Sequence, residues 1–143
     1  MKKIILVIGA ILLLGLILIN ILSEDTGTMA TDGIEINTTY LKDSKDLVAD
    51  MSISGNLRKE RTLDIKTLLK ENNTISIKND QFGSEIEFIV INSNGKKVFS
   101  EMIKGDAIRS FKSLSGVGNI KLVLNSGQQN TVIIINGDEL NNE

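Results

Sequence analysis

Residues 85–95 read Glu-Ile-Glu-Phe-Ile-Val-Ile-Asn-Ser-Asn-Gly, an apolar run that ends in a turn signal. Apolar side chains alternate at its start and occupy both faces from Phe88 to Ile91, which is typical of a central strand in a covered sheet. Asn94-Gly95 suits the positive φ angles of a tight hairpin. The stretch therefore predicts a strand and a hairpin, with residues 97–103 as the returning strand.

The same period of two recurs on both sides of this hairpin, which is the pattern of strands with one buried face. A final hairpin is expected, in which residues 126–129 form the turn. Seven or eight short strands at such intervals predict an all-β fold, a single β-sandwich. The expected strands cover residues 34–40, 49–54, 63–65, 75–77, 85–91, 97–103, 120–125 and 132–135.

Three segments also fit short helices, because their apolar residues are spaced by three or four positions. These are residues 44–51, 62–72 and 106–114. Strand or loop is favoured for the first two. For the third, a helical turn capped by Asp106 fits equally well.

The chain opens with Lys2-Lys3 and then runs almost without interruption through apolar residues to Leu22. Nineteen helical residues span about 28 Å, close to the thickness of the hydrocarbon core of a bilayer. We therefore expect residues 1–23 to form a membrane anchor. Anchor residues singled out in this stretch are Ile4, Leu12, Leu13, Leu14, Leu18 and Leu22.

The charges that flank the anchor predict its orientation. Basic flanks stay in the cytoplasm, so the N-terminus is expected inside the cell and the rest of the chain outside, at the cell membrane. Two alternatives remain: a cleaved signal peptide, with processing near Ser23 or Ala30, and a buried helix of a soluble protein.

The remainder divides by composition. Residues 24–33 are small and polar and are expected to form a linker. Residues 34–136 carry the alternating pattern and are expected to form the sandwich, and residues 137–143 a flexible acidic tail.

The pattern between Gly95 and Ile135 supports a family resemblance. It contains Val98-Phe99 at the end of a hairpin strand, then Gly118-Asn119-Ile120-Lys121-Leu122, a turn and a β-branched closing strand. This resembles the end of small immunoglobulin-like sandwiches tethered to bacterial cell surfaces. The richness in Ile, Asn and Lys and the absence of Pro are similar to proteins of low-GC Gram-positive bacteria. The resemblance implies an immunoglobulin-like fold and no active residues.

The composition restricts the chemistry. The chain has no His and no Cys, which excludes Ser-His-Asp triads, thiol nucleophiles and the common zinc sites. Ser93 and Lys96 fit the letters of Ser-x-x-Lys, but they lie in the predicted hairpin turn rather than at a helix start. We therefore expect no catalytic residues, no cofactor and no enzyme activity.

Two acidic clusters could suggest a metal site. Neither matches the calcium-loop pattern, so no metal ligand is predicted, although calcium binding by a loop stays an alternative. The clusters are Asp43, Asp46 and Asp50, and Asp80, Glu85 and Glu87.

Charge and aromatic content bear on partners. Beyond the two N-terminal lysines, 14 Lys and Arg face 18 Asp and Glu, a net charge of −4, which disfavours nucleic acid. Aromatic residues are few. Phe82 lies in a predicted turn and is either an exposed contact residue or a plug of the core.

These observations predict a non-catalytic, membrane-tethered sandwich module for protein interaction or envelope assembly. Its expected partners are the membrane and an envelope protein, with no recognisable small-molecule ligand. The alternatives are a secreted sandwich factor released by cleavage and a hydrolase of unrecognised type.

Overall fold

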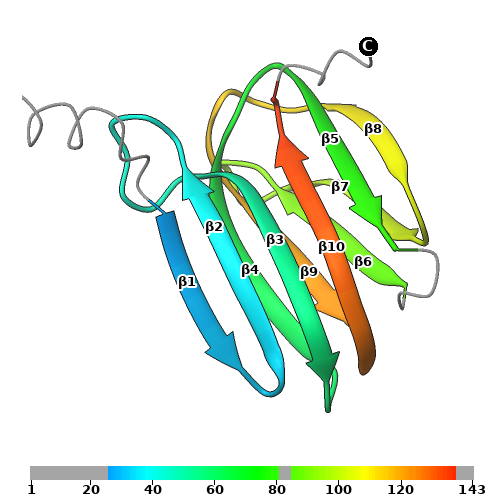
Figure 1. Ribbon diagram of the computed structural model, residues 1–143. Coiled ribbons are helices and arrows are strands. Elements are labelled where there is room, and N and C mark those ends of the chain that lie inside the picture. Colours follow the sequence, from blue (N-terminus) through cyan, green and yellow to red (C-terminus); the bar gives the residue numbers. More distant parts are fainter. Residues whose placement is uncertain (1–25, 81–84, 138–143) are drawn as a thin grey trace, which may run out of the picture.

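The computed structural model describes residues 26–80 and 85–137, which form two packed β-sheets (Figure 1). Within these residues no helix is long and apolar enough to cross a membrane; the predicted anchor lies outside them. The strands are β1 (Thr26–Thr31), β2 (Ile34–Tyr40), β3 (Val48–Leu57), β4 (Arg61–Leu69), β5 (Asn72–Asn79), β6 (Ile86–Ile91), β7 (Lys97–Ile103), β8 (Ala107–Lys112), β9 (Gly116–Leu124) and β10 (Gly127–Ile135).

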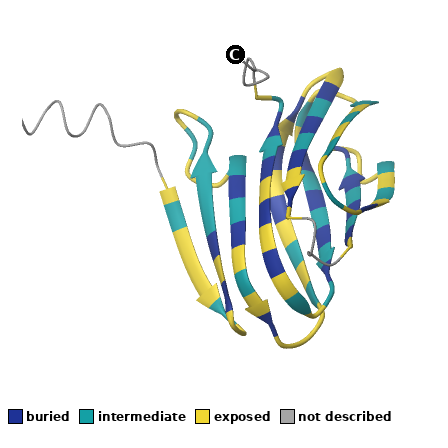
Figure 2. Ribbon diagram, turned by 45° about the vertical axis from the view of Figure 1, so that its right-hand side comes forward, coloured by how far each residue is buried: buried dark blue, intermediate teal, exposed yellow. Residues whose placement is uncertain are grey.

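The two sheets differ in size. Sheet A has six strands in the order β1-β2-β3-β10-β5-β8, and sheet B has four in the order β4-β9-β6-β7. Burial alternates along most strands, with the buried residues on the faces that the sheets turn toward each other (Figure 2). Phe88 on β6, Ile120 on β9 and Ile133 on β10 are fully buried in this core.

The strand order follows from one long antiparallel hairpin. Its tip is the turn at Asn94-Gly95, and from there outward β6 pairs with β7, β5 with β8, β4 with β9 and β3 with β10. Rolling this hairpin so that alternate pairs fall into opposite sheets produces the double-sheet arrangement known as a jelly roll. The β1–β2 hairpin extends sheet A beyond it.

The prediction of an all-β sandwich is confirmed, but its immunoglobulin-like topology is wrong. The predicted final hairpin is also wrong, because β9 lies in sheet B and β10 in sheet A. Residues 125–126 therefore carry the chain from one sheet to the other. Alternation of apolar residues specifies which face of a strand is buried but does not specify its partner, so the pattern was equally consistent with either topology.

The segments that also fitted short helices contain strands. In β4, Ile65, Thr67 and Leu69 are buried whereas Lys66 and Leu68 are exposed, which is the period of a strand. Residues 107–112 form β8.

Residues 26–31, which lie within the predicted linker, form β1. This strand pairs with β2 from Thr26 opposite Thr39 to Thr31 opposite Ile34. Asp32 and Gly33 join the two strands with φ angles of 48° and 90°, as a tight hairpin requires.

Candidate ligand-binding groove

One side of the sandwich is closed. Where β7 of sheet B meets β8 of sheet A, the rings of Phe99 and Phe111 stack with their centres 5.4 Å apart. Beside them Arg109 donates hydrogen bonds to both carboxylate oxygens of Glu101, the shortest being 2.7 Å from Nη2 to Oε1. These contacts connect the edges of the two sheets.

The ion pair shifts the pKa of both side chains. The hydrogen bonds from Arg109 hold the pKa of the Glu101 carboxyl below its usual value, and the same bonds raise the pKa of the Arg109 guanidinium. Both side chains remain partly exposed, so this is a surface ion pair that joins the edges of the two sheets.

The opposite side of the sandwich is open. Sheet B ends at β4 while sheet A continues past β3 through β2 and β1 (Figure 1). A groove of about 570 Å³ lies between the overhanging strands and β4. We call it the β1–β4 groove. Its floor is apolar and consists of Met29, Ile36, Val48, Met51, Leu63 and Ile65. Its rim is charged and consists of Lys45, Asp46, Arg61, Asp64 and Lys66.

The floor includes an apolar side chain that sheet B leaves uncovered. Met29 of β1 lies opposite Ile36 of β2, which lies opposite Ile53 of β3, so all three side chains share the inner face of sheet A. Their exposed fractions are 55%, 5% and 1%. Met29 is exposed because no strand of sheet B lies beneath it.

Polar contacts define the two ends of the groove. At one end Nη1 of Arg61 donates a hydrogen bond to Oγ1 of Thr31 at 2.7 Å and another to the carboxylate of Asp32. At the other end the hydroxyl of Thr67 donates to the backbone carbonyl of Val48 at 2.7 Å. These bonds tie β4 to sheet A at both ends.

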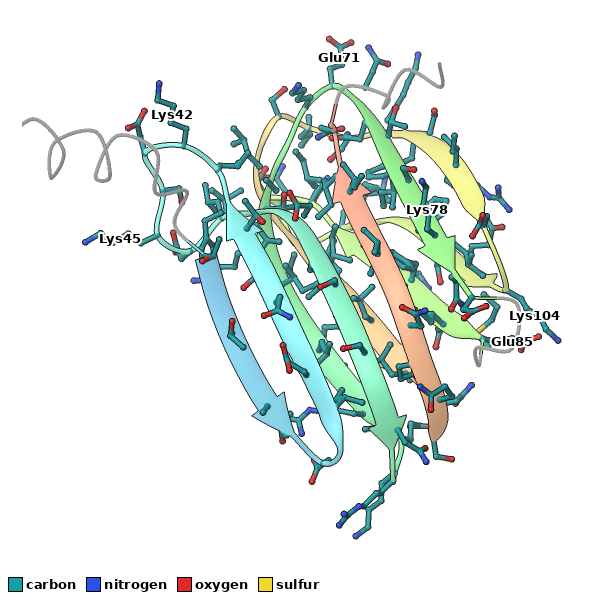
Figure 3. All side chains as sticks on the ribbon, viewed as in Figure 1. Lys42, Lys45, Glu71, Lys78, Glu85 and Lys104 are labelled. Carbon is teal, nitrogen blue, oxygen red and sulfur yellow. The ribbon has the colours of Figure 1, made fainter. Side chains whose placement is uncertain are left out.

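The β2–β3 loop adds charges at the upper end. Lys45 extends from this loop (Figure 3), and Asp46 lies 4.0 Å from the ammonium of Lys66. Both partners of that ion pair are largely exposed, so the contact is weak and either charge can exchange it for a ligand.

A glycine shapes the inner wall near this end. A Cβ built on Gly27 of β1 would lie 2.8 Å from the hydroxyl of Tyr40. The absence of a side chain at this position allows the Tyr40 ring to lie across β1, where it lines the groove.

The groove therefore combines an apolar floor with a rim of both charges. In the ranges 26–80 and 85–137, no three residues among His, Cys, Asp and Glu are grouped so that they could hold a metal ion. Of the acidic clusters noted in the sequence, Asp46 contributes to the rim of the groove, where its neighbour is a lysine.

None of the site residues predicted from the sequence is among the described residues that line the β1–β4 groove. Phe82 and the anchor residues Ile4, Leu12, Leu13, Leu14, Leu18 and Leu22 lie outside the described residues. The groove was missed because its outer wall, β1, falls within the predicted linker. One signal was available, namely Met29, an apolar residue among small polar ones.

No protein-family model matches the chain, and no curated protein sequence is similar to it. Solved structures with a similar fold include the CENP-C cupin domain of Drosophila melanogaster, with 11% identity over 76% of this chain and 73% of that chain and a TM-score of 0.40. A Bacillus subtilis oxalate decarboxylase shares 13% identity over 80% of this chain and 28% of its own, with a TM-score of 0.41. Procruciferin, an 11S globulin of Brassica napus, shares 16% over 79% and 28%, with a TM-score of 0.45.

The function predicted from the sequence is corrected accordingly. The strand order is that of a jelly roll rather than that of an immunoglobulin-like sandwich. The predicted immunoglobulin-like interaction module is therefore contradicted, whereas its location at the cell membrane rests on residues outside the described ranges and stays a prediction. The expectation that this chain is not an enzyme stays a prediction.

Proposed function

We propose that this chain is a binding protein whose β1–β4 groove holds an elongated ligand with apolar groups along one side. The observation that carries the proposal is Met29, a half-exposed apolar side chain on the inner face of a sheet, beside the edge strand of the other sheet. Ligand sites are concave and mostly apolar, with a few polar groups that orient the ligand. The floor and rim of the groove have this composition.

We also propose that the domain is displayed outside the cell membrane by residues 4–22. This stretch is long enough to span a bilayer as a helix, and Lys2-Lys3 on its N-terminal side favour a cytoplasmic N-terminus. A ligand of the groove would then come from the cell exterior.

Methionine methyl groups provide a direct test of binding. The full chain, held in lipid nanodiscs and labelled with ¹³C at the methionine methyl groups, would be titrated with three soluble elongated probes: decanoate, maltoheptaose and the heptapeptide Thr-Val-Glu-Val-Lys-Val-Thr. We expect at least one probe to shift the Met29 resonance in a saturable manner, because this methyl group lines the groove.

Met102 is the matched internal control. It lies on β7, is 51% exposed and does not line the groove, so its resonance should not follow the titration. The proposal is wrong if none of the probes shifts Met29, or if every probe shifts both methionines alike.

The proposed location has a separate test. Leu13→Arg places a charge in the middle of the apolar stretch at a cost of about 2.5–3.5 kcal/mol for insertion. The variant should move from the membrane fraction to the soluble fraction, whereas Leu114→Arg, at an exposed position of the domain, should not. Retention of Leu13→Arg in the carbonate-washed membrane fraction would argue against the anchor.

A further inference from the structure

We propose, building on the function above, that the ligand of the β1–β4 groove is an extended polypeptide segment that adds to β4 as a fifth strand of sheet B. The segment runs antiparallel to β4 and lies beneath the β1–β2 hairpin. Three features of the groove lead to this ligand class: the edge of β4, the overhang of β1 and β2, and the charges on β4.

The edge of β4 favours a ligand that can form hydrogen bonds along its length. β4 pairs with β9 along one side, from Arg61 to Leu69, and is the outermost strand of sheet B on the other. Covering this edge with a purely apolar ligand would separate backbone N–H and C=O groups from water without replacing their hydrogen bonds. An extended peptide replaces them one by one, as in other cases of strand addition.

The overhang provides the second layer for such a strand. β3 stands over β4, to which it is joined by the bond from Thr67 to Val48, and β2 is the next strand of sheet A. Neighbouring strands are about 4.8 Å apart, so a strand added to β4 lies beneath the β1–β2 hairpin, whose inner face is exposed at Met29. Its inward side chains then cover Met29, which is 55% exposed on the inner face of sheet A.

The same overhang excludes a second folded copy of this domain. Antiparallel pairing of β4 with its counterpart in another copy would place both six-stranded sheets on the same side of the joined sheet. Each β1–β2 hairpin would then occupy the space of the other. A single extended segment has no second layer and fits.

The length of the groove limits the length of the segment. The bonds of Arg61 to Thr31 and of Thr67 to Val48 mark its two ends. From Arg61 to Thr67, both included, β4 has seven residues, which span about 20 Å as a strand. The segment that pairs is therefore about seven residues long.

The charges of β4 specify which side chains the segment carries on its outer face. Asp64 and Lys66 are two residues apart on the exposed face of β4. Each has an exposed ion-pair partner, Lys121 of β9 at 3.8 Å and Asp46 at 4.0 Å, and a strand added on the free side of β4 supplies a further neighbour of opposite charge, which is stabilising. An antiparallel partner therefore carries an acidic residue opposite Lys66 and a basic residue opposite Asp64, with apolar residues between them. The heptapeptide Thr-Val-Glu-Val-Lys-Val-Thr has this order, and with its Glu opposite Lys66 it pairs with residues 62–68 of β4.

Backbone methylation distinguishes strand addition from apolar contact. One version of the heptapeptide would be N-methylated at its valines and a second at Glu and Lys, with binding to the full chain in nanodiscs followed through the Met29 methyl resonance. Along a strand in an antiparallel pair, alternate N–H groups point to the partner. We therefore expect one version to bind about tenfold more weakly and the other to bind nearly as the parent does.

Exchange of charges tests the register. The peptide Thr-Val-Lys-Val-Glu-Val-Thr has the same composition but places like charges opposite Asp64 and Lys66. It should bind about fivefold more weakly than the parent peptide. The double variant Asp64→Lys, Lys66→Asp should reverse this preference.

The outcomes separate this inference from the proposed function. If both methylated peptides bind like the parent, or if decanoate or maltoheptaose shifts Met29 and the heptapeptide does not, strand addition is overturned and groove binding stands. If none of the three probes shifts Met29, both fail. A single weakened methylated peptide together with the reversed charge preference supports strand addition.

Discussion

At the scale of single residues, side chains on the same face of a sheet differ according to what lies opposite. Met29 and Ile36 are register partners on neighbouring strands, yet their burial differs greatly. The difference arises because the core of the sandwich covers β2 at Ile36 but does not reach β1 at Met29. At the other side of the sandwich the edges of the two sheets meet, and there the side chains of Glu101 and Arg109 form an ion pair.

The Glu101–Arg109 pair predicts a pH dependence of stability. Because Arg109 lowers the pKa of Glu101 in the folded state, the pair stabilises the fold at pH values above the ordinary carboxyl pKa, and this contribution is lost as pH falls through the lowered value. Glu101→Gln should therefore lower the melting temperature at pH 6, and the difference from wild type should shrink toward pH 3.

The control removes the partner instead. In an Arg109→Gln background, Glu101→Gln should produce a difference in melting temperature that no longer depends on pH in this way. A gap between wild type and Glu101→Gln that stays constant from pH 6 to pH 3 would show that the pair does not contribute as described.

At the scale of elements, the β1–β2 hairpin is positioned by close backbone contact with β3. A Cβ built on Gly33 would lie 2.3 Å from the carbonyl oxygen of Asn56, and one built on Gly55 would lie 2.4 Å from the carbonyl oxygen of Gly33. The amide of Asn56 donates a hydrogen bond to that same Gly33 carbonyl at 2.9 Å. The overhang that forms the groove therefore depends on glycines at this turn.

Gly33→Ala should destabilise the domain by about 2 kcal/mol or more. The alanine would combine the strain of a positive φ, about 1–2 kcal/mol, with backbone overlap at Asn56. Gly105→Ala is the matched control, because Gly105 also has a positive φ, of 72°, but a Cβ there would meet nothing within 4 Å. Urea unfolding of the full chain measures both variants; equal losses would mean that the backbone contact does not matter.

At the scale of the whole molecule, distant segments form the core. β10 lies between β3 and β5 in sheet A, and Gly127 at its start pairs with Leu57. β1, by contrast, pairs only with β2 among the strands of the described residues. A strand inside a sheet contributes two rows of hydrogen bonds and a share of the core, whereas an edge strand contributes one row.

Two truncations test this difference. A chain that ends before Gly127 loses β10 and should not fold, because Ile133 and Ile135 leave the core and β3 and β5 lose their shared partner. A chain without residues 26–33 should remain folded, with the β1–β4 groove opened. Circular dichroism and cooperative thermal unfolding distinguish the two; cooperative unfolding after loss of β10 would contradict the role assigned to that strand.

Much of the fold was predictable at the level of strands. The hairpin at Asn94-Gly95 and the strand from Ile34 to Tyr40 were anticipated, because a turn signal and the alternation of apolar residues are local properties. The pairing of β9 with β6 and β4 was not, and neither was β1, whose small polar residues resemble a linker. The candidate groove requires both the position of β4 at the edge of sheet B and the presence of β1, and the alternation of apolar residues along single strands predicts neither.

The all-β class, the residues that face the core and the turn of the central hairpin could be inferred from the amino-acid sequence, because each depends on neighbours along the chain. The pairing of β3 with β10 and the larger size of sheet A became visible in the folded arrangement alone. These features depend on which buried faces meet in space, and alternation is compatible with many such arrangements. The exposure of Met29 beside the edge of β4 is a consequence of that choice.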